Sequence, residues 1–498
     1  MGVLLVVSGC SHNLAHLTIL STTDFHGALE STKRDAEGRP LGGAASLAVA
    51  IDRHRAENPH GTLYLDAGDS LNGTALSSLT QGRPVVELME LLGLDATAIG
   101  NHEFDFGVPA LRDRIGEASS PFLAANIIYK DTDAVPDWVT PYEIFDLVGL
   151  RVAVIGLATV STPVTTLPAN VEPFVFLDPA PLVNDWVARL VPTEADLVVV
   201  VGHLGIGRGN GNRASTGELV QLASQVQGVA AFVGGHTHRV FTGKVDGVPV
   251  VQAGDSGTAL GRIDLTYNTK KRKIRSSRVR AFPIVANPED DRPAVQQLVA
   301  TYRPQVDALM QEVLAHAGAE IARSRNGESA MSNLVTDAWR SQIEVDFVFQ
   351  NRGGVRSSLE SGPITYEDLF RVLPFENTLV ELRLTGAEIE ELLVQAVEQG
   401  RPPLDASGLR YVLDLSQQPA TLISTEPVLQ PDRRYRVSVN NFMAQGGDGL
   451  ELLKAQPEAI DTGIPFRDAV AAWLRAETAA GRKIQPLVDQ RLQIIRSQ

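Results

Sequence analysis

One stretch of the sequence indicates the fold: Ala96-Thr97-Ala98-Ile99-Gly100-Asn101-His102-Glu103-Phe104-Asp105. A short apolar run, typical of a buried strand, stops at a glycine, and amide, imidazole and carboxylate side chains follow at once. These are side chains that bind divalent metal ions. The stretch therefore predicts a strand that ends at a metal site.

The same arrangement recurs along the first half of the chain. Apolar runs rich in Val, Ile and Leu lie at Leu17–Ser21, Thr62–Leu65, Ala96–Ile99, Val152–Ile155, Leu197–Val201, Val229–Val233 and Val248–Gln252. Segments with helical periodicity, such as Ala44–Ala56 and Val85–Leu92, separate several of them. This alternation predicts an α/β layer structure.

Five of these runs lead into loops of metal-type ligands. The loops are Asp24-Phe25-His26-Gly27, Gly68-Asp69-Ser70, Gly100-Asn101-His102-Glu103-Phe104-Asp105, Gly202-His203 and Gly234-Gly235-His236-Thr237-His238. Because the carboxyl ends of strands in an open α/β sheet gather on one edge, we expect the loops to converge. Two divalent ions need a shared carboxylate and several neutral ligands, and this set supplies both, with Asp69 as the candidate bridge. The histidines outside these loops are expected to be solvent exposed: His12, His16, His54, His60 and His316.

The composition excludes several classes of function. The chain has 44 Lys plus Arg and 59 Asp plus Glu, a formal charge of −15, which argues against a nucleic-acid polymer as partner. No stretch approaches the ~18 to 20 apolar residues of a membrane-spanning helix. Cys10 is the one cysteine, so His, Asp and Asn must hold any metal. This nitrogen-rich ligation suits Zn or Mn better than Mg or Ca.

The first residues resemble a processing signal. Val7-Ser8-Gly9-Cys10 follows an apolar run and resembles a bacterial lipoprotein cleavage box, in which the cysteine is lipidated. No Lys or Arg precedes the run, and the alternative is a terminal segment with a chance cysteine. The lipoprotein interpretation predicts a periplasmic or extracellular protein with a lipid anchor at Cys10.

The second half of the chain shows a different pattern. Between Asn287 and Ala317 the apolar spacing is helical, which predicts one or two helices that join two domains. A helix over Met331–Ile343, strands over Val345–Phe349 and Leu379–Leu384, and a helix that begins at Thr385-Gly386-Ala387-Glu388 are predicted beyond it. This pattern is typical of an α+β domain.

The five ligand loops together resemble the signature of calcineurin-like metallophosphoesterases. The resemblance implies that one metal ion is held by Asp24, His26, Asp69 and His238, and a second by Asp69, Asn101, His203 and His236. It also implies that His102 contacts the substrate phosphate and that Asp105 orients or tunes His102. Two such cations lower the pKa of water, so that hydroxide attacks phosphorus near neutral pH.

Three motifs in the second half resemble the C-terminal domain of the 5′-nucleotidase/UDP-sugar hydrolase family. They are Asn351-Arg352-Gly353-Gly354-Val355-Arg356, Leu373-Pro374-Phe375 and Asn441-Phe442-Met443-Ala444-Gln445-Gly446-Gly447-Asp448-Gly449. The resemblance implies substrate-binding roles for Arg325, Asn351, Arg356, Phe375, Phe442 and Asp448, with the two phenylalanines around the base and Asp448 on the ribose. Composition alone favours core aromatics and a surface arginine instead. Ser332 and Gln445 replace a usual glycine and asparagine, and Arg352 also stands where glycine is common.

The resemblance implies a four-layer α/β/β/α metallophosphoesterase domain and a C-terminal α+β substrate-binding domain, joined by a helical linker. The expected boundaries are a signal-like segment at 1–14, the first domain at 15–286, the linker at 287–317 and the second domain at 318–498. The implied activity is hydrolysis of nucleoside 5′-monophosphates to nucleoside and phosphate, extending to nucleotide diphosphates or UDP-sugars. Two alternatives stay open: a 2′,3′-cyclic-nucleotide 2′-phosphodiesterase/3′-nucleotidase, and a catalytically silent nucleotide-binding surface protein.

Overall fold

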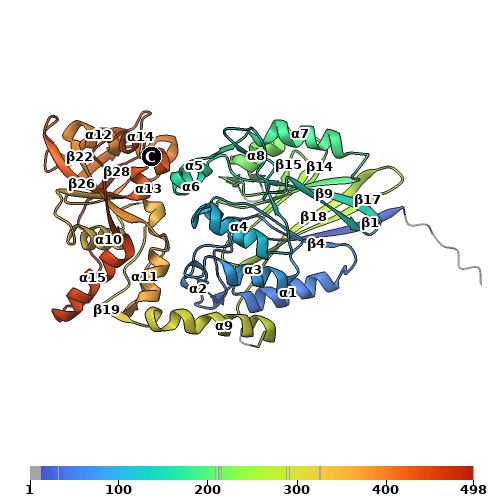
Figure 1. Cartoon of the computed structure of the whole chain (residues 1–498), viewed down its shortest axis with the longest axis horizontal. Coiled ribbons are helices and arrows are strands. Elements are labelled where there is room, and N and C mark those ends of the chain that lie inside the picture. Colours follow the sequence, from blue (N-terminus) through green and yellow to red (C-terminus); the bar gives the residue numbers. More distant parts are fainter. Residues whose placement is uncertain are drawn as a thin grey trace, which may run out of the picture.

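The chain folds into two lobes of different architecture (Figure 1). The computed structural model describes residues 13–31, 33–207, 209–210, 213–214, 216–287, 289–290, 292–324 and 327–496. Cys10 and Arg325 lie outside the described residues. Among the described helices, none has both the length and the apolar character needed to span a membrane.

Two six-stranded sheets form the centre of the N-terminal lobe, in the orders β18-β17-β1-β4-β5-β6 and β15-β16-β14-β11-β9-β8. The first comprises β1 (Leu14–Thr22), β4 (Thr62–Asp66), β5 (Ala96–Ala98), β6 (Phe122–Leu123), β17 (Ala259–Asn268) and β18 (Lys273–Pro283). The second comprises β8 (Tyr142–Leu147), β9 (Leu150–Leu157), β11 (Leu197–Gly202), β14 (Val229–Gly234), β15 (Val240–Val245) and β16 (Val248–Ala253). The seven strands predicted from apolar runs are all present.

The sheets pack face to face and helices cover their outer faces. Ile19 of β1 and Val199 of β11 share the core between the sheets, whereas the next residue in β1, Leu20, faces the opposite side and packs among residues of the covering helices. The first sheet is covered by α1 (Ala44–Ala56), α3 (Arg83–Leu92) and α4 (Gly107–Glu117), and the second by α7 (Pro179–Leu190) and α8 (Glu218–Gln225) (Figure 1). The predicted four-layer α/β/β/α arrangement is confirmed.

The ligand loops come from both sheets, so the expectation that they share the edge of one open sheet is wrong. β1, β4 and β5 are parallel neighbours in the first sheet, and β11 and β14 are parallel neighbours in the second. Parallel strands place their carboxyl ends at one edge. Stacking the two sheets brings those two edges together, and the loops meet there.

A five-stranded sheet and a three-stranded sheet form the C-terminal lobe, in the orders β23-β20-β26-β22-β27 and β25-β24-β28. The strands are β20 (Phe347–Gln350), β22 (Thr378–Thr385), β23 (Asp405–Ser407), β24 (Arg410–Asp414), β25 (Thr421–Glu426), β26 (Arg434–Asn440), β27 (Ile460–Pro465) and β28 (Leu492–Ile495). The helices include α10 (Ala330–Arg340), α11 (Tyr366–Val372), α12 (Gly386–Gln395), α13 (Asn441–Ala444), α14 (Glu451–Lys454) and α15 (Phe466–Ala479). Both hydrogen bonds of the capping box predicted at Thr385 and Glu388 are present.

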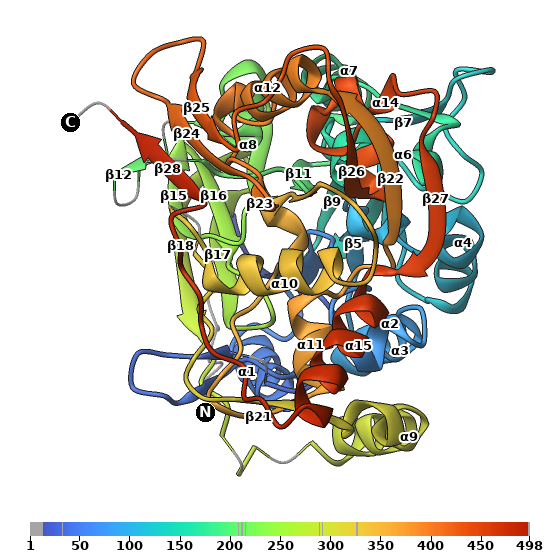
Figure 2. The same cartoon turned by 90° about the vertical axis from the view of Figure 1, so that its left-hand side faces the viewer.

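Helix α9 (Pro293–Met310) runs below both lobes in Figures 1 and 2 and leads into the C-terminal lobe. The predicted helical segment ends early, because Val313–Ala317 forms strand β19, which pairs with β21 (Gly362–Thr365) and gains ladder hydrogen bonds there. Arg303 of α9 contacts carboxylates of both lobes, with 2.8 Å to Glu30 and 3.5 Å to Glu367.

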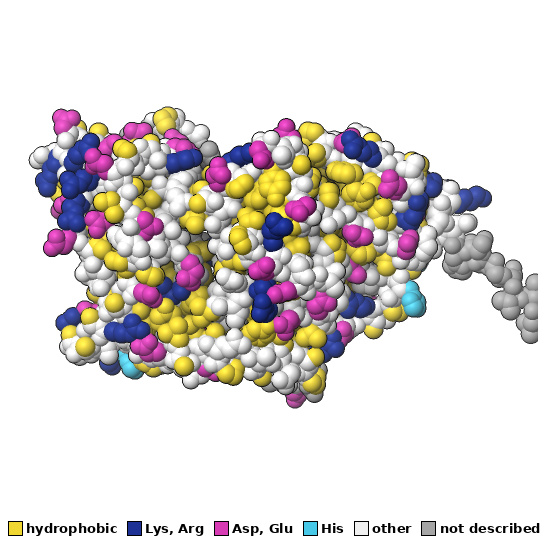
Figure 3. All heavy atoms as spheres, viewed as in Figure 1, with side chains coloured by type: hydrophobic (Ala, Val, Ile, Leu, Met, Phe, Trp, Pro, Cys, Tyr) yellow, Lys and Arg dark blue, Asp and Glu magenta, His cyan; other side chains and the backbone are white. Residues whose placement is uncertain are grey.

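Short elements complete the described parts of the chain. They are β2 (Lys33–Arg34), β3 (Pro40–Leu41), α2 (Ala75–Ser78), η1 (His102–Phe104), β7 (Ile127–Tyr129), α5 (Thr162–Thr165), α6 (Pro168–Val171), β10 (Phe174–Phe176), β12 (Gly209–Asn210), β13 (Arg213–Ala214), η2 (Arg352–Gly354), η3 (Glu398–Gly400) and η4 (Gly447–Gly449). Helix α5 packs against η4, so the two lobes also meet above the linking helix. On the side shown in Figure 3, basic, acidic and hydrophobic side chains are interspersed, and no continuous basic face is visible.

Candidate active site

Two clusters of metal-type ligands lie where the predicted loops converge. Asp24, His26 and His238 form one cluster, and Asp69, His203 and His236 form the other. Within each cluster the potential ligand atoms all lie within 4.8 Å of one another. Each residue comes from a loop that follows a strand, as the sequence predicted. Each cluster could hold one metal ion.

The hydrogen bonds of two histidine rings direct their Nε2 atoms toward the clusters. Nδ1 of His26 lies 2.9 Å from the carbonyl oxygen of Asn72, and Nδ1 of His203 lies 2.8 Å from that of Ala67. A carbonyl oxygen only accepts, so each Nδ1 carries a proton, and each Nε2 is the ring atom left to bind a metal ion. Nε2 of His203 lies 2.9 Å from Asp69 Oδ2 and 3.2 Å from His236 Nδ1. Such a gathering of nitrogen lone pairs and carboxylate oxygen fits a divalent cation.

Asn101 adds a second observation in favour of a cation. Its amide nitrogen donates to the carbonyl oxygen of Thr165 at 3.1 Å, which identifies Oδ1 as the free end of the side chain. Oδ1 is buried and accepts no hydrogen bond from the described protein. A buried amide oxygen without a partner is costly, and a bound metal ion would satisfy it. The residues therefore fit bound divalent metal ions.

The backbone of the site is strained at most of its ligands. Positive φ angles occur at Asp24 (50°), His26 (49°), Asp69 (56°), His236 (77°) and His238 (56°). Residues other than glycine rarely adopt this region, and such strain persists only where the surrounding structure enforces it. At Gly100, any Cβ would overlap the Asp69 carboxylate, so this loop requires glycine. The backbone is thus arranged to bring the ligands together.

Electrostatics keep two of the ligand histidines neutral. Burial, reinforced by the charge of His238, lowers the pKa of His26 to about 3. Burial, reinforced by the charge of His203, lowers the pKa of His236 to about 4. For His203, burial acts in the same direction, but the charge of Asp69 outweighs it and raises the pKa to about 10. Neutral imidazole is the form that binds a metal ion.

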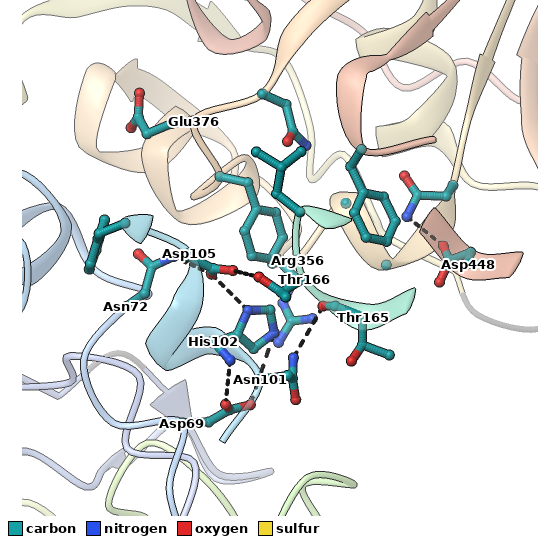
Figure 4. A pocket seen from close by; sticks show the side chains of 18 of the residues that line it. Asp69, Asn72, Asn101, His102, Asp105, Thr165, Thr166, Arg356, Glu376 and Asp448 are labelled. Carbon is teal, nitrogen blue, oxygen red and sulfur yellow. Dashed lines mark hydrogen bonds and ion pairs between the residues drawn. The ribbon is translucent and has the colours of Figure 1, made fainter. Parts of the chain in front are cut away.

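His102 and Asp105 form a hydrogen-bonded pair beside the clusters (Figure 4). Nδ1 of His102 lies 2.7 Å from Asp105 Oδ2, and its backbone N–H donates to Asp69 Oδ1 at 2.8 Å. Burial alone would lower the pKa of His102, but the charges of Asp105 and Asp69 outweigh it and the pKa lies above its usual value. The other ring nitrogen, Nε2, lies 4.0 Å from Asp69 Oδ2. This nitrogen is directed toward the ligand clusters.

Three further residues position this site, and sequence reasoning assigned them no role. Asp105 accepts hydrogen bonds from Asn72 Nδ2 at 2.7 Å and from Thr166 Oγ1 at 2.8 Å, which fixes the carboxylate that holds His102. Glu103 is buried and accepts backbone N–H groups of the Asp69 loop and of Gly100. Glu103 lies within the quoted Asn101–Asp105 motif, so the signal for it was present, whereas Thr166 lies in a segment without a motif.

One pocket joins the metal clusters to the second lobe (Figure 4). Its lining includes Asp69, Asn101, His102, Asp105, His236 and His238 from the first lobe and Asn351, Arg356, Phe375, Phe442 and Asp448 from the second. Nδ2 of Asn351 donates to Asp448 Oδ2 at 2.7 Å. The Phe375 ring stacks on the His102 ring, with 5.4 Å between centroids and 21° between planes. The guanidinium carbon of Arg356 lies 5.7 Å from the centroid of the Phe375 ring.

For residues outside the pocket, some of the predictions from the sequence are confirmed and one is wrong. Arg352 is buried, and its guanidinium pairs with Asp405 at 3.0 Å. The arginine that stands in place of the usual glycine therefore has a structural contact. The expectation of exposure is wrong for His54, which is 5% exposed, accepts a hydrogen bond from Arg262 and packs on the Phe282 ring. His16, His60 and His316 are exposed as predicted. The spacing of apolar residues could not predict the polar contacts that bury His54.

The fold and this site define a metallophosphoesterase, and comparison with known proteins agrees. Residues 17–240 match the family model of calcineurin-like phosphoesterases, and residues 308–455 match that of the 5′-nucleotidase C-terminal domain. The chain belongs to the 5′-nucleotidase family. It is therefore a phosphoester hydrolase whose fold implies divalent metal ions and whose family binds nucleotides.

Three relatives illustrate the similarity. The chain is 31% identical to a snake venom 5′-nucleotidase of Naja atra over 90% of this chain and 93% of that protein. It is 30% identical to endonuclease YhcR of Bacillus subtilis (strain 168) over 86% of this chain, but it spans only 37% of that protein. The crystal structure of a 5′-nucleotidase precursor from Thermus thermophilus has a TM-score of 0.86 and 30% identity, covering 97% of this chain and 100% of that one.

Proposed function

We propose that the protein hydrolyses nucleoside 5′-monophosphates to nucleoside and phosphate with two bound divalent ions, Zn or Mn. The observation that carries this proposal is one pocket that is lined by candidate metal ligands from the first lobe and by a paired amide and carboxylate with two phenylalanines from the second. A nucleoside 5′-monophosphate has matching chemistry, with a phosphate at one end and a flat base at the other. The relatives named as 5′-nucleotidases support the same substrate class.

We assign the ligands as two sets that share one carboxylate. Asp24, His26, Asp69 and His238 would hold one ion, and Asp69, Asn101, His203 and His236 would hold the other. When bound, the ions supply Lewis acidity that activates water and neutralises phosphate charge. The chain contributes the strained backbone and the carbonyl contacts that hold the ligand rings in place.

His102 and Asp105 are the proposed catalytic residues. Because Asp105 holds Nδ1 of His102, the other ring nitrogen is free to donate a hydrogen bond to a phosphate oxygen. Asp105 keeps the ring in this orientation through the bonds that it accepts from Asn72 and Thr166. Charge that develops on the phosphate is thereby met by a donor already in place.

The second lobe binds the nucleoside. Phe375 and Phe442 contribute flat apolar surface for the base, and Asn351 contributes an amide for its polar edge. The Asp448 carboxylate, held by Asn351, is suited to ribose hydroxyls. Arg325 and Arg356 are assigned to the polar groups of the substrate. We assign residues 15–286 to the metal-binding domain and residues 318–498 to the nucleoside-binding domain.

A substrate panel tests the proposal. Hydrolysis of 5′-AMP, 3′-AMP, 2′,3′-cyclic AMP, ADP and UDP-glucose is followed with added Mn or Zn, with and without chelator, by measuring both released phosphate and the nucleotide monoester products. Preference for 5′-AMP that a chelator abolishes is the expected result. Activity confined to the cyclic and 3′ substrates would establish the phosphodiesterase/3′-nucleotidase alternative, and silence on every substrate would favour a binding protein.

We propose export of the protein and lipidation at Cys10. The lipobox-like residues support this location, as do relatives described as venom enzymes. Labelling of the expressed full-length protein with a radioactive fatty acid tests the anchor. Loss of label in Cys10→Ser is expected, and absence of label in the wild type would contradict the anchor.

A further inference from the structure

The ring of His238 contacts a side chain, whereas the rings of two other ligand histidines contact the main chain. Nδ1 of His26 and Nδ1 of His203 face carbonyl oxygens, at 2.9 Å and 2.8 Å. Nδ1 of His238 instead lies 3.3 Å from Oδ2 of Asp255, a residue without a role in the proposed function. Any residue supplies a main-chain carbonyl, but the contact to His238 depends on the side chain at position 255.

Asp255 lies in the turn between β16 and β17, and this turn contacts a second metal-type ligand. The carbonyl oxygen of Asp255 accepts hydrogen bonds from the N–H of Thr258 at 2.9 Å and from its hydroxyl at 2.6 Å. The N–H of Ser256 donates to the carbonyl oxygen of Asp24 at 2.8 Å. One turn thus contacts two ligands of the same cluster, Asp24 through the backbone and His238 through the Asp255 carboxylate.

The β2–β3 hairpin reaches the same carboxylate. Lys33 of β2 pairs through Nζ with Oδ2 of Asp255, the oxygen that also faces His238. Gly42, which follows β3, has a φ of 75°, and a Cβ there would lie 2.4 Å from the Ser256 carbonyl oxygen, so the hairpin needs glycine to approach the turn this closely. The Asp255 side chain is 11% exposed, and two donors hold its oxygen in place.

The contact with Asp255 decides which nitrogen of His238 faces the cluster. A carboxylate only accepts hydrogen bonds, so Nδ1 of His238 carries a proton. Nε2 is the ring atom left to bind a metal ion, and it lies 3.4 Å from Asp24 Oδ1 and 3.1 Å from His26 Nε2. Contacts of this kind between a carboxylate and a ligand histidine fix the tautomer and the orientation of the ring.

We propose, building on the proposed function, that Asp255 is a positioning residue for His238 and sets how tightly the chain holds the metal ion among Asp24, His26 and His238. The hydrogen bond from Nδ1 of His238 keeps Nε2 directed at that ion. The other cluster does not depend on this contact, because the ring of His203 is held by a main-chain carbonyl oxygen. Loss of Asp255 therefore weakens one of the two metal sites selectively.

A metal titration of chelator-stripped protein tests the proposal, with Zn shared between the protein and a chromophoric chelator. The wild type should bind two ions, and Asp255→Ala should bind one of them about 10- to 100-fold more weakly, the loss typical of a residue that supports a metal ligand. Its affinity for the other ion should stay close to that of the wild type. Unchanged binding of both ions, or equal weakening of both, would overturn the proposal.

Two conservative variants separate ring orientation from charge. Asp255→Asn keeps an oxygen that accepts from Nδ1 of His238, so it should recover most of the affinity lost in Asp255→Ala. Lys33→Gln leaves the carboxylate in place and should bind both ions like the wild type, as should Asp131→Asn at an exposed position outside the site. If Asp255→Asn or Lys33→Gln bound Zn as weakly as Asp255→Ala, charge would be responsible and the proposal would fall.

A double-mutant cycle shows whether Asp255 acts through His238. In the background of His238→Ala there is no ring to orient, so adding Asp255→Ala should cost no further Zn affinity. Losses that add in the double variant would contradict a positioning role.

Melting temperatures separate a folding defect from a defect in metal binding. Asp255→Ala without metal should melt close to the metal-free wild type, and added Zn should raise its melting temperature less. An equal rise in both proteins would count against the proposal. These measurements need no substrate, so a failure to hydrolyse 5′-AMP would overturn the proposed function and leave this result standing. A wild type that binds fewer than two ions would overturn both.

Discussion

His26 and His238 are 212 residues apart in the sequence, and their Nε2 atoms lie 3.1 Å apart. The Nδ1 atom of each ring is engaged elsewhere, with the Asn72 carbonyl oxygen at 2.9 Å and Asp255 Oδ2 at 3.3 Å, respectively. Two ring nitrogens can face each other at this distance only around a shared proton or cation. Because Asp24 joins them, the pair is best understood as half of a metal site.

Substitution of His26 should remove one metal ion. His26→Ala deletes a ligand of one cluster only, so we expect bound Zn or Mn to fall from two ions per chain to about one, with activity lost. Mass spectrometry of the dialysed protein measures metal content. His60→Ala, at an exposed histidine outside the site, is the control and should keep both ions. Retention of two ions in His26→Ala would contradict the ligand assignment.

Substitution of His102 should separate catalysis from metal binding. His102→Ala removes the proposed donor to the phosphate, so kcat for 5′-AMP should fall by about 10² to 10⁴. Metal content should stay at the wild-type level, because the ring belongs to neither ligand set. Steady-state kinetics and metal analysis on the same preparation measure both. Loss of metal together with activity would show that His102 is a ligand and not the phosphate contact.

Thr166 should act through the catalytic pair. Thr166→Val removes the hydrogen bond to Asp105 Oδ1, so kcat should fall about tenfold with KM little changed, and the pH dependence of kcat should shift. The neighbouring Thr165→Val is a matched control, because Oγ1 of Thr165 bonds to Ser161 and not to Asp105. Similar kinetics of the two variants would argue against a positioning role for Thr166.

The two phenylalanines should differ in their effects. Phe442→Ala should raise KM for 5′-AMP and leave a small aryl phosphate ester unaffected, because that ester has no base. Phe375→Ala should raise KM for 5′-AMP and also lower kcat for both substrates, because Phe375 stacks on His102. Steady-state kinetics on the two esters test this. Equal losses on both substrates in Phe442→Ala would indicate a core residue.

His54 should make the stability of the protein depend on pH. Burial lowers the pKa of His54 below its usual 6.5, and the charge of Arg262 adds to this effect. The unfolded chain takes up a proton as the pH falls through 6.5, whereas His54 in the folded chain resists protonation. The folded state therefore loses stability as the pH decreases. Melting temperatures between about pH 7.5 and pH 5.5 should drop less in His54→Gln than in the wild type.

An exposed histidine supplies the control for this prediction. His60→Gln should keep the full pH dependence of the wild type, because the His60 side chain is exposed to solvent. A drop in melting temperature that is the same in His54→Gln and in the wild type would show that His54 does not contribute.

Much of the fold could be predicted because its strands are buried. Seven apolar runs matched strands, since a strand buried on both faces reads as a continuous apolar segment. The ligand loops were recognisable because a metal restricts which residue types can follow those strands. The loops come from two stacked sheets, and periodicity could not predict this because it does not indicate which strands pair.

The remaining misses have physical reasons. Thr166 and Asn72 act through hydrogen bonds between loops, and no local pattern records such contacts. His54 is buried by Arg262, which lies 208 residues later in the sequence. Val313–Ala317 continues a helical apolar pattern but forms a strand, because pairing with β21 outweighs local preference.

The central claim is that one pocket unites two metal ions with a nucleoside site, and anomalous diffraction tests it most directly. Crystals grown with Mn and adenosine should show one anomalous peak among Asp24, His26 and His238 and a second among Asp69, His203 and His236. Density for the adenine ring should lie beside Phe375 and Phe442. A single peak, peaks elsewhere, or adenosine bound away from these rings would contradict the account.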